Sequence, residues 1–429
     1  MKKRSCLRYI ILILFFSILL MANVILYFTY DNLNLIRVPH DVDRKANGNT
    51  LIASVSFSEM LHHIKREKDQ IPMEHNNPQH EIIEVNTKGD IVWRFYGLAC
   101  PHEVLELPNG HLLVADTQFD RVIEIDYPNK NIIWSWEPAK INWTKVNPKW
   151  GADHYYNNPR TYDWTHLNDV DFKQYGSWNA CLISIRNFDL IVEINYTADF
   201  NDPNNPKNVV WWYGDFENHS MLFRQHNPDY LKNGDIIVAD SGNDRIIEVN
   251  YTTKEIIWKL DKGLKWPRDA DELPNGNILI TDSSNSRVIE YDKNTNEVVW
   301  SYSQDLIIPY ESDLLNNTHV LISSAYNGLV LEVNRAGIVI WRWGYSYVKA
   351  VLYLNCILTL IISLMSLFFR IKKLKFNKIR SQQITYKSYI IIGMLIFFIV
   401  ASIILLIFYS QIFAFIAKSF YTSLGPEAF

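Results

Sequence analysis

Six side chains suited to anion chemistry recur at the same place in a repeated segment of this 429-residue chain. Imidazole, guanidinium and phenol groups are hydrogen-bond donors, and imidazole also titrates near neutral pH. A ring of such groups would therefore favour an anionic ligand. The six residues are His40, His102, His166, His226, Arg268 and Tyr310.

The third copy departs from the others in a way that adds chemistry. Where three other copies have Asp followed by Thr or Ser, at Thr117, Ser241 and Ser283, this one reads Ser184-Ile185-Arg186-Asn187, and Asn168 stands two residues after its histidine. A guanidinium fork matches the geometry of tetrahedral oxyanions, so a sulfate or phosphate group is the expected ligand. The alternative is an Arg186 held in a structural ion pair.

A purely structural role is the alternative for the repeated histidine, since a residue at a strand start often bonds a neighbouring carbonyl. The last two copies replace the histidine with Arg268 and Tyr310 without losing the strand pattern, which favours a functional role. A structural role is expected instead for the recurring aspartate and the arginine five residues later. These pairs are Asp116 with Arg121, Asp240 with Arg245 and Asp282 with Arg287.

The repeat itself predicts the fold. Seven residues after four of the six anchor residues comes Asn-Gly, a dipeptide typical of a tight hairpin, and the copy at His166 has a longer hairpin. Each copy then continues with two strand-like runs, the second rich in tryptophan and β-branched residues. Six copies of four strands predict an all-β, six-bladed propeller over residues 31–346, with the equivalent positions converging on its axis.

Three apolar runs outside the repeats predict membrane helices, because each approaches the roughly 20 residues that cross a bilayer. They are Tyr9 to Phe28, Val351 to Phe369 and Ile390 to Ile416. A cleaved signal peptide is the alternative for the first, but its apolar core is long for one and no small-x-small cleavage site follows. The last two contain no Asp, Glu, Lys, Arg or His, which favours anchoring over a channel.

The expected topology follows from the basic loop at 370–387, which should be cytoplasmic. Residues 1–30 would form an anchor helix and 347–429 two transmembrane helices, with the propeller on the extracytoplasmic side of the cell membrane.

Composition excludes several classes of protein. A net charge of −4 without a basic stripe gives no support for nucleic-acid binding. Four cysteines are too few for a disulfide scaffold, although Cys100 and Cys181 could form one bridge. No copy contains a dense His, Cys and carboxylate cluster at metal-ligand spacing, so neither a catalytic metal nor a cofactor is expected.

An ordered set of motifs resembles the arylsulfate sulfotransferase family over residues 36 to 345. The set comprises Pro101-His102-Glu103, His166-x-Asn168, Ser184-x-Arg186-Asn187 and Arg224-Gln225-His226. The resemblance implies a six-bladed propeller enzyme that moves a sulfuryl group from an aryl sulfate donor to a phenolic acceptor without a nucleotide sulfate.

The resemblance also implies roles for individual residues. His226 would be the nucleophile that forms a transient sulfohistidine, and His102 would assist proton transfer. Arg186, His166 and Asn168 would bind the sulfuryl oxygens, while His40, Arg268 and Tyr310 complete the ring around the substrate. Well-known members have an N-terminal β-domain and a disulfide loop that are not evident here, and Asn227 stands where an acidic residue is expected.

Two other readings of the propeller remain open. Residues 239–246 resemble the NHL repeat, which would favour a module that binds a glycan, a peptide or a protein. A calcium-dependent hydrolase would need carboxylates clustered at the axis, whereas the aligned axis positions are mostly histidine.

Overall fold

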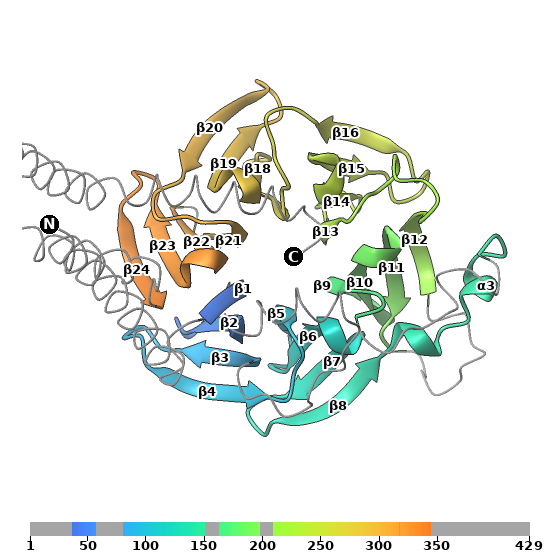
Figure 1. Ribbon diagram of the computed structural model, residues 1–429, viewed down its shortest axis with the longest axis horizontal. Helices are drawn as coiled ribbons and strands as arrows, with labels where there is room; N and C mark the ends of the chain where they lie inside the picture. The colour runs from blue at the N-terminus through green and yellow to red at the C-terminus, as the bar shows by residue number, and fades with distance from the viewer. Residues whose placement is uncertain (1–36, 57–79, 151–162, 198–208, 317, 345–429) are drawn as a thin grey trace, which may run out of the picture. The chain divides into compact units, whose positions relative to one another are not determined.

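The computed structural model describes residues 37–56, 80–150, 163–197, 209–316 and 318–344, which fold into six four-stranded antiparallel sheets around one axis (Figure 1). The predicted six-bladed propeller is thus confirmed. The three predicted membrane spans lie outside the described residues and stay predictions. Among the residues described, no helix is long and apolar enough to cross a membrane.

Each blade is one contiguous segment whose strands run in order from the axis outwards (Figure 1). Blade 1 contains β1 (Arg37–Arg44), β2 (Thr50–Ser56), β3 (Glu81–Val85) and β4 (Ile91–Tyr96). Blade 2 contains β5 (Pro101–Glu106), β6 (Leu112–Asp116), β7 (Arg121–Asp126) and β8 (Asn131–Trp136). Blade 3 contains β9 (Leu167–Tyr175), β10 (Trp178–Ile185), β11 (Leu190–Asn195) and β12 (Val209–Gly214).

The second half of the ring follows the same plan. Blade 4 contains β13 (His226–Tyr230), β14 (Ile236–Asp240), β15 (Arg245–Val249) and β16 (Ile256–Leu260). Blade 5 contains β17 (Asp269–Glu272), β18 (Ile278–Asp282), β19 (Arg287–Asp292) and β20 (Glu297–Tyr302). Blade 6 contains β21 (Pro309–Leu315), β22 (His319–Ser324), β23 (Leu329–Asn334) and β24 (Val339–Gly344).

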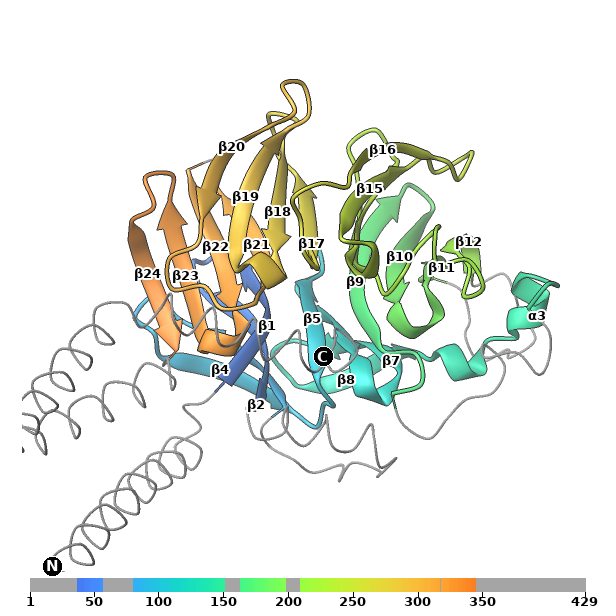
Figure 2. The same ribbon diagram turned by 45° about the horizontal axis from the view of Figure 1, so that its top comes forward.

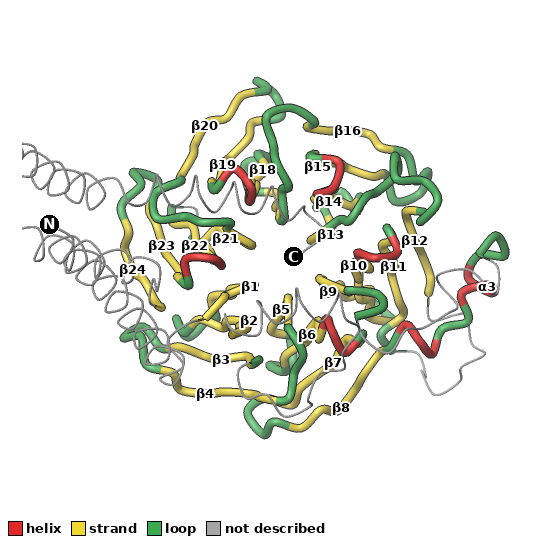
Figure 3. The backbone as a smooth tube through the Cα atoms, viewed as in Figure 1, coloured by secondary structure: helices red, strands yellow, loops and turns green. Residues whose placement is uncertain are grey.

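Short helical turns join the second and third strands of blades 2 to 6 and appear in red around the ring (Figure 3). They are η1 (Thr117–Phe119), η4 (Arg186–Phe188), η6 (Ser241–Asn243), η7 (Ser283–Asn285) and η8 (Ala325–Asn327). The long connection after β8 holds η2 (Pro138–Lys140) and α3 (Trp143–Val146). These turns begin with the residue that follows the second strand, so they bring Thr117, Arg186 and Ser241 to the same end of the blades.

The Asn-Gly pairs form the inner hairpins as predicted. Gly234 has a φ of +88°, a conformation that a residue with a Cβ rarely adopts, and its amide donates to the Leu231 carbonyl at 2.9 Å. The predicted longer hairpin in blade 3 is also confirmed, since β9 and β10 have nine and eight residues.

The core lies between the blades, because both faces of each sheet are covered by neighbouring sheets. The second strands β6, β14 and β18 are buried along their whole length. An apolar cluster joins each pair of adjacent blades, including blades 1 and 6. The predicted structural aspartates lie in these layers, and Asp116, Asp240 and Asp282 accept from their predicted arginines at 2.7, 2.6 and 2.6 Å.

The tryptophan that recurs in the outermost strands has a structural role between blades. In four blades the indole N–H donates to a backbone carbonyl of the next blade, at 2.7 to 3.2 Å. The donors are Trp93, Trp211, Trp300 and Trp341.

The ring closes without sharing a strand between its first and last blades, since β1 and β24 belong to different sheets. Side chains make the closure instead. Arg44 pairs with Glu332 at 2.8 Å, Trp341 donates to the Thr87 carbonyl at 3.1 Å, and Ser323 donates to the His40 carbonyl at 3.1 Å.

Candidate active site

The innermost strands, among them β1, β5, β9 and β17, surround the axis of the ring (Figure 2). The six anchor residues lie within the first four residues of these innermost strands or directly before them. The His40 ring stacks on Tyr310 with centroids 4.5 Å apart and lies 4.3 Å from the His102 ring. The His102 ring is 5.2 Å from His166, and the guanidinium of Arg268 lies 3.8 Å above Tyr310. The predicted convergence of the six residues is therefore found in the structure.

His226 is held by a hydrogen bond at each of its ring nitrogens. Its Nδ1 lies 2.8 Å from Ser241 Oγ, which itself donates to the Pro267 carbonyl at 2.5 Å. Because the Ser241 proton is used there, Nδ1 must carry the proton that it donates to the hydroxyl. Nε2 then holds the lone pair, and it accepts from Arg268 Nη1 at 2.9 Å.

Arg268 has N–H groups that are not used in hydrogen bonds to the described residues. Its side chain is 1% exposed, yet Nε and Nη2 have no hydrogen-bond partner among the described residues. A buried guanidinium with unused N–H groups is costly unless an anion or ordered water completes it. This residue therefore supplies both a cation and directed donors next to the His226 lone pair.

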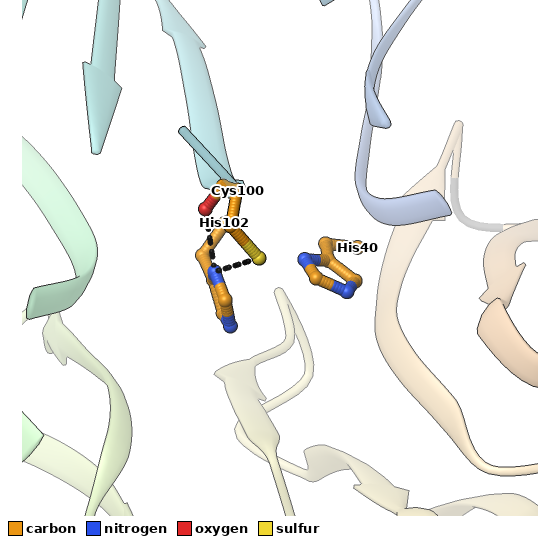
Figure 4. Close-up of side chains that lie close together, drawn as sticks. All are labelled: His40, Cys100 and His102. Carbon is orange, nitrogen blue, oxygen red and sulfur yellow. Dashed lines mark hydrogen bonds between the residues drawn. The ribbon is translucent and has the colours of Figure 1, made fainter. Parts of the chain in front are cut away.

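His102 presents its other nitrogen in a similar way. Nδ1 lies 3.0 Å from the Cys100 carbonyl and 2.9 Å from Thr117 Oγ1, so this nitrogen carries the proton and Nε2 is the acceptor. The thiol of Cys100 lies 3.9 Å from Nδ1 and is directed between the rings of His102 and His40 (Figure 4). Cys100 thus lies inside the site, and it does not form the possible disulfide with Cys181.

Blade 3 adds an Asp–His pair and an amide. His166 Nδ1 is 2.9 Å from Asp163 Oδ2, with both side chains nearly buried. The Asn168 amide donates to the Gln225 carbonyl at 3.0 Å, one residue before His226. Asn168 therefore fixes the backbone that carries His226, a contact that its predicted role as a sulfuryl ligand did not include.

Arg186 lies close enough to influence two of the imidazoles. Burial lowers the pKa of His226 well below its usual value of 6.5, and the charges of Arg268 and Arg186 lower it further. Burial also lowers the pKa of His102, where His166, Arg268 and Arg186 add to the effect. The pKa of His40 falls for the same reason, with burial as the largest cause. All three imidazoles are consequently neutral at neutral pH.

A cavity of about 390 Å³ opens beside Arg186, between the turn η4 and the connection from β12 to β13. Phe216, His219 and Phe223 give it aromatic walls, and Arg224 also contributes. His219 Nδ1 is 2.7 Å from Asp189 Oδ2. Arg186 lines this cavity, and its charge also acts on the pKa values of His226 and His102.

Residues that could hold a metal come together here although no single copy has metal-ligand spacing. One group is His40, Cys100 and His102, whose candidate ligand atoms lie within 4.8 Å of one another. His102 Nδ1 is already hydrogen-bonded to the Cys100 carbonyl and to Thr117, so Nε2 is the nitrogen of His102 that could bind a metal. The other two groups contain carboxylates only: Asp41, Glu103 and Glu311, and Asp229, Asp269 and Asp271.

The comparison with protein families bears directly on blades 2 and 3. Residues 96–227 match the arylsulfotransferase (ASST) family. The matched segment contains His102, His166, Asn168, Arg186 and His226, so it includes the motifs on which the resemblance was based. This match confirms the resemblance and supports an arylsulfotransferase-type function in a propeller.

Other comparisons add little to the function. No curated protein matches the chain. A protein of unknown function from Bacteroides caccae aligns at 14% identity over 62% of this chain and 89% of its own, with a TM-score of 0.43. A virginiamycin B lyase from Staphylococcus aureus aligns at 9% identity over 70% of this chain and 83% of its own, also with a TM-score of 0.43. These distant likenesses carry no argument about chemistry.

The structure brings all eight predicted site residues to this end of the propeller, and it adds several that sequence reasoning missed. Thr117 and Ser241 follow the recurring Ala-Asp, and this position also aligns with Arg186, so that alignment could have identified them. Asp163 and Cys100 lie outside the repeated positions, and no sequence signal marked them.

Proposed function

We propose that this protein transfers a sulfuryl group from an aryl sulfate to a phenol through a covalent intermediate on His226. The observation that carries the proposal is the contact of Arg268 with the Nε2 lone pair of His226, next to guanidinium N–H groups that have no other described partner. A neutral imidazole is the form that can attack sulfur, and the lowered pKa of His226 supports that form at neutral pH.

In the first half-reaction the sulfate ester occupies the axis and Arg268 turns its donors to the sulfuryl oxygens. The Nε2 lone pair attacks sulfur and the bond between sulfur and the aryl oxygen breaks. The electron pair of that S–O bond leaves with the phenolate. Arg186 and Arg268 stabilise the negative charge on the equatorial oxygens and on the departing phenolate. Ser241 keeps the proton on Nδ1 bonded while the ring becomes positive.

In the second half-reaction a phenol replaces the departed phenolate. His102 Nε2 accepts the phenolic proton while the phenol oxygen attacks sulfur, and the pair of the N–S bond returns to His226. The proton then passes from His102 to solvent or to a phenolate. The lowered pKa of His102 favours this role as a base over a role as the acid in the resting enzyme.

The cavity beside Arg186 fits the aryl part of the substrate. Its volume lies in the range of ordinary ligand pockets, and Phe216 and Phe223 offer aromatic faces for stacking against a phenyl ring within a lining that is otherwise mostly polar. Substitution of Phe223 with alanine should raise KM for aryl sulfates more than it lowers kcat.

The test is phenolate release from a chromogenic aryl sulfate by the full chain, with and without a second phenol. We expect acceptor-dependent release that disappears in His226→Ala, and a sulfuryl adduct on the His226 peptide by mass spectrometry when the acceptor is omitted. His111→Gln is a matched control, because His111 pairs with Glu124 at 2.7 Å away from the axis. Release that persists in folded His226→Ala would refute the proposed nucleophile.

A further inference from the structure

Two tiers of carboxylates line the axis next to the histidines. The strand register places an acidic residue near the axis in five blades: Asp41, opposite Ala53 in β2, and Glu103, Asp169, Asp269 and Glu311, each opposite the residue just before the end of the second strand. Two positions further along the inner strands lies a second set: Asp43, Asp171, Asp229, Asp271 and Asp313. Blade 4 has no first-tier carboxylate, because the residue after its anchor is Asn227, at the register shift between His226 and Pro228, and Leu105 takes the second-tier position in blade 2.

Three carboxylates of the first tier converge. Candidate ligand oxygens of Asp41, Glu103 and Glu311 all lie within 4.8 Å of one another, although these residues come from three different blades. Asp41 and Glu103 are buried and Glu311 is half-buried. Among the described residues, no lysine, arginine or histidine forms an ion pair with any of the three.

Asp41 supplies a second, independent observation. One of its oxygens, Oδ2, accepts from the Val104 amide at 2.7 Å, which fixes the carboxylate in the cluster. The other, Oδ1, has no hydrogen-bond partner among the described residues, and the side chain is 0% exposed. Asp169, the next carboxylate of the same tier, likewise has a buried Oδ2 without a described partner. A buried carboxylate oxygen without a donor either takes up a proton or coordinates a cation.

The ligand chemistry selects the kind of cation. Oxygen-only, carboxylate-rich sites suit calcium, which accepts six to eight oxygens at about 2.3–2.6 Å and tolerates irregular geometry. Magnesium demands a near-ideal octahedron, and zinc prefers imidazole or thiolate ligands. We propose that Asp41, Glu103 and Glu311 bind one calcium ion at the axis of the propeller.

The position of this cluster gives the ion a mechanical role. Glu311 belongs to blade 6, Asp41 to blade 1 and Glu103 to blade 2, so one ion would join three consecutive blades. The junction between blades 6 and 1 is where the ring closes without sharing a strand. A bound calcium ion would hold that junction shut and would add positive charge beneath the anion-binding histidines. This inference does not depend on the proposed sulfuryl transfer.

A shared proton is the rival occupant, because Asp41 and Glu311 lie close enough to hydrogen-bond to each other when one is protonated. The two occupants can be distinguished by equilibrium dialysis of the chelator-treated full chain with radioactive calcium at neutral pH. Calcium occupancy predicts one ion per chain and a higher Tm with calcium than with an equal concentration of magnesium. Failure to bind calcium at millimolar concentration would overturn the proposal in favour of the proton.

Substitution of the proposed ligands tests where the calcium ion binds. Asp41→Asn and Glu311→Gln should each weaken calcium binding by about ten-fold or more, since affinity depends on the charged ligands, and both should reduce the calcium-dependent rise in Tm. Asp171→Asn is the matched control, because it removes a negative charge of the second tier from the axis and belongs to neither carboxylate group that could hold a metal. Unchanged binding in Asp41→Asn and Glu311→Gln, or an equal loss in Asp171→Asn, would overturn this site. Circular dichroism of each ligand-free variant verifies that it is folded.

Discussion

Replacement of Arg268 with methionine should separate activity from stability. The side chain makes one hydrogen bond, to His226 Nε2 at 2.9 Å, and lies 3.8 Å above the Tyr310 ring. The bond contributes about 1.5–3 kcal/mol and the ring contact about 1–2 kcal/mol. Against these gains stand two buried nitrogens without described partners, at about 1–3 kcal/mol each, and the desolvation of a charge. The two sides nearly cancel, so the free energy of unfolding should change little.

The effect on sulfuryl transfer should be much larger. Loss of one preorganised donor at a developing negative charge typically lowers kcat by about 10²–10³. Arg268→Met should therefore lose about 3 kcal/mol of transition-state stabilisation in the aryl sulfate assay, while its urea midpoint stays close to that of the unmodified chain.

A second arginine provides the opposite control. Arg287 pairs with the fully buried Asp282 at 2.6 Å and lies away from the axial histidines. Arg287→Met leaves a buried carboxylate without its cation, which should cost about 1–3 kcal/mol of stability with little effect on kcat. If Arg268→Met unfolds as readily as Arg287→Met and keeps its activity, then Arg268 is structural and the reasoning fails.

Three further predictions concern the nucleophile and the ring. The pKa of His226 is lowered by burial, Arg268, Arg186, His102 and His166, so kcat/KM should hold constant as the pH falls through 6.5 and drop only at lower pH, whereas half-loss at 6.5 would contradict the neutral, buried imidazole. Ser241→Ala should lower kcat by about ten-fold with little change in KM, because it removes the 2.8 Å contact to Nδ1, and Ser241→Thr should restore the rate. Trp341→Phe removes one hydrogen bond between blades 6 and 1, and Trp300→Phe removes the equivalent bond between blades 5 and 6. Each should lower the free energy of unfolding in urea by about 1 kcal/mol. An unchanged free energy of unfolding in both variants would show that these bonds do not stabilise the ring.

Much of the fold could be predicted because its signals are local and repeated. Each Asn-Gly pair specifies a hairpin within a few residues, and six copies make the number of sheets unambiguous. The convergence of His40, Arg268 and Tyr310 also followed from the repeat, since equivalent positions must face the axis. The membrane spans stay predictions of hydropathy, and residues 9–28, 351–369 and 390–416 lie outside the described structure.

The carboxylate tiers were harder to predict, because they form from residues that are far apart in the sequence. Asp41 and Glu311 lie at opposite ends of the repeat region and become neighbours only when the ring closes. A search for metal ligands at close spacing within one copy therefore passes over them. The residue after each anchor could have revealed the first tier, since it is acidic at Asp41, Glu103, Asp269 and Glu311.

The structural role of Asn168 was hidden for a different reason. Its amide is used on the Gln225 carbonyl, a contact between two blades that depends on how adjacent sheets are placed. Sequence motifs place Asn168 near the site but do not show which atom it bonds.

The absence of a shared strand has a consequence for how this propeller can be rearranged. Because every sheet is built from one uninterrupted stretch of chain, a backbone cut in the connection between any two blades would leave all six sheets complete. A circular permutant that starts at blade 4 and joins blade 6 to blade 1 through a peptide linker would therefore keep the same hydrogen-bonded ladders. It would also replace a junction held by side chains with a covalent one, which makes the closure a natural place to engineer a more heat-resistant ring.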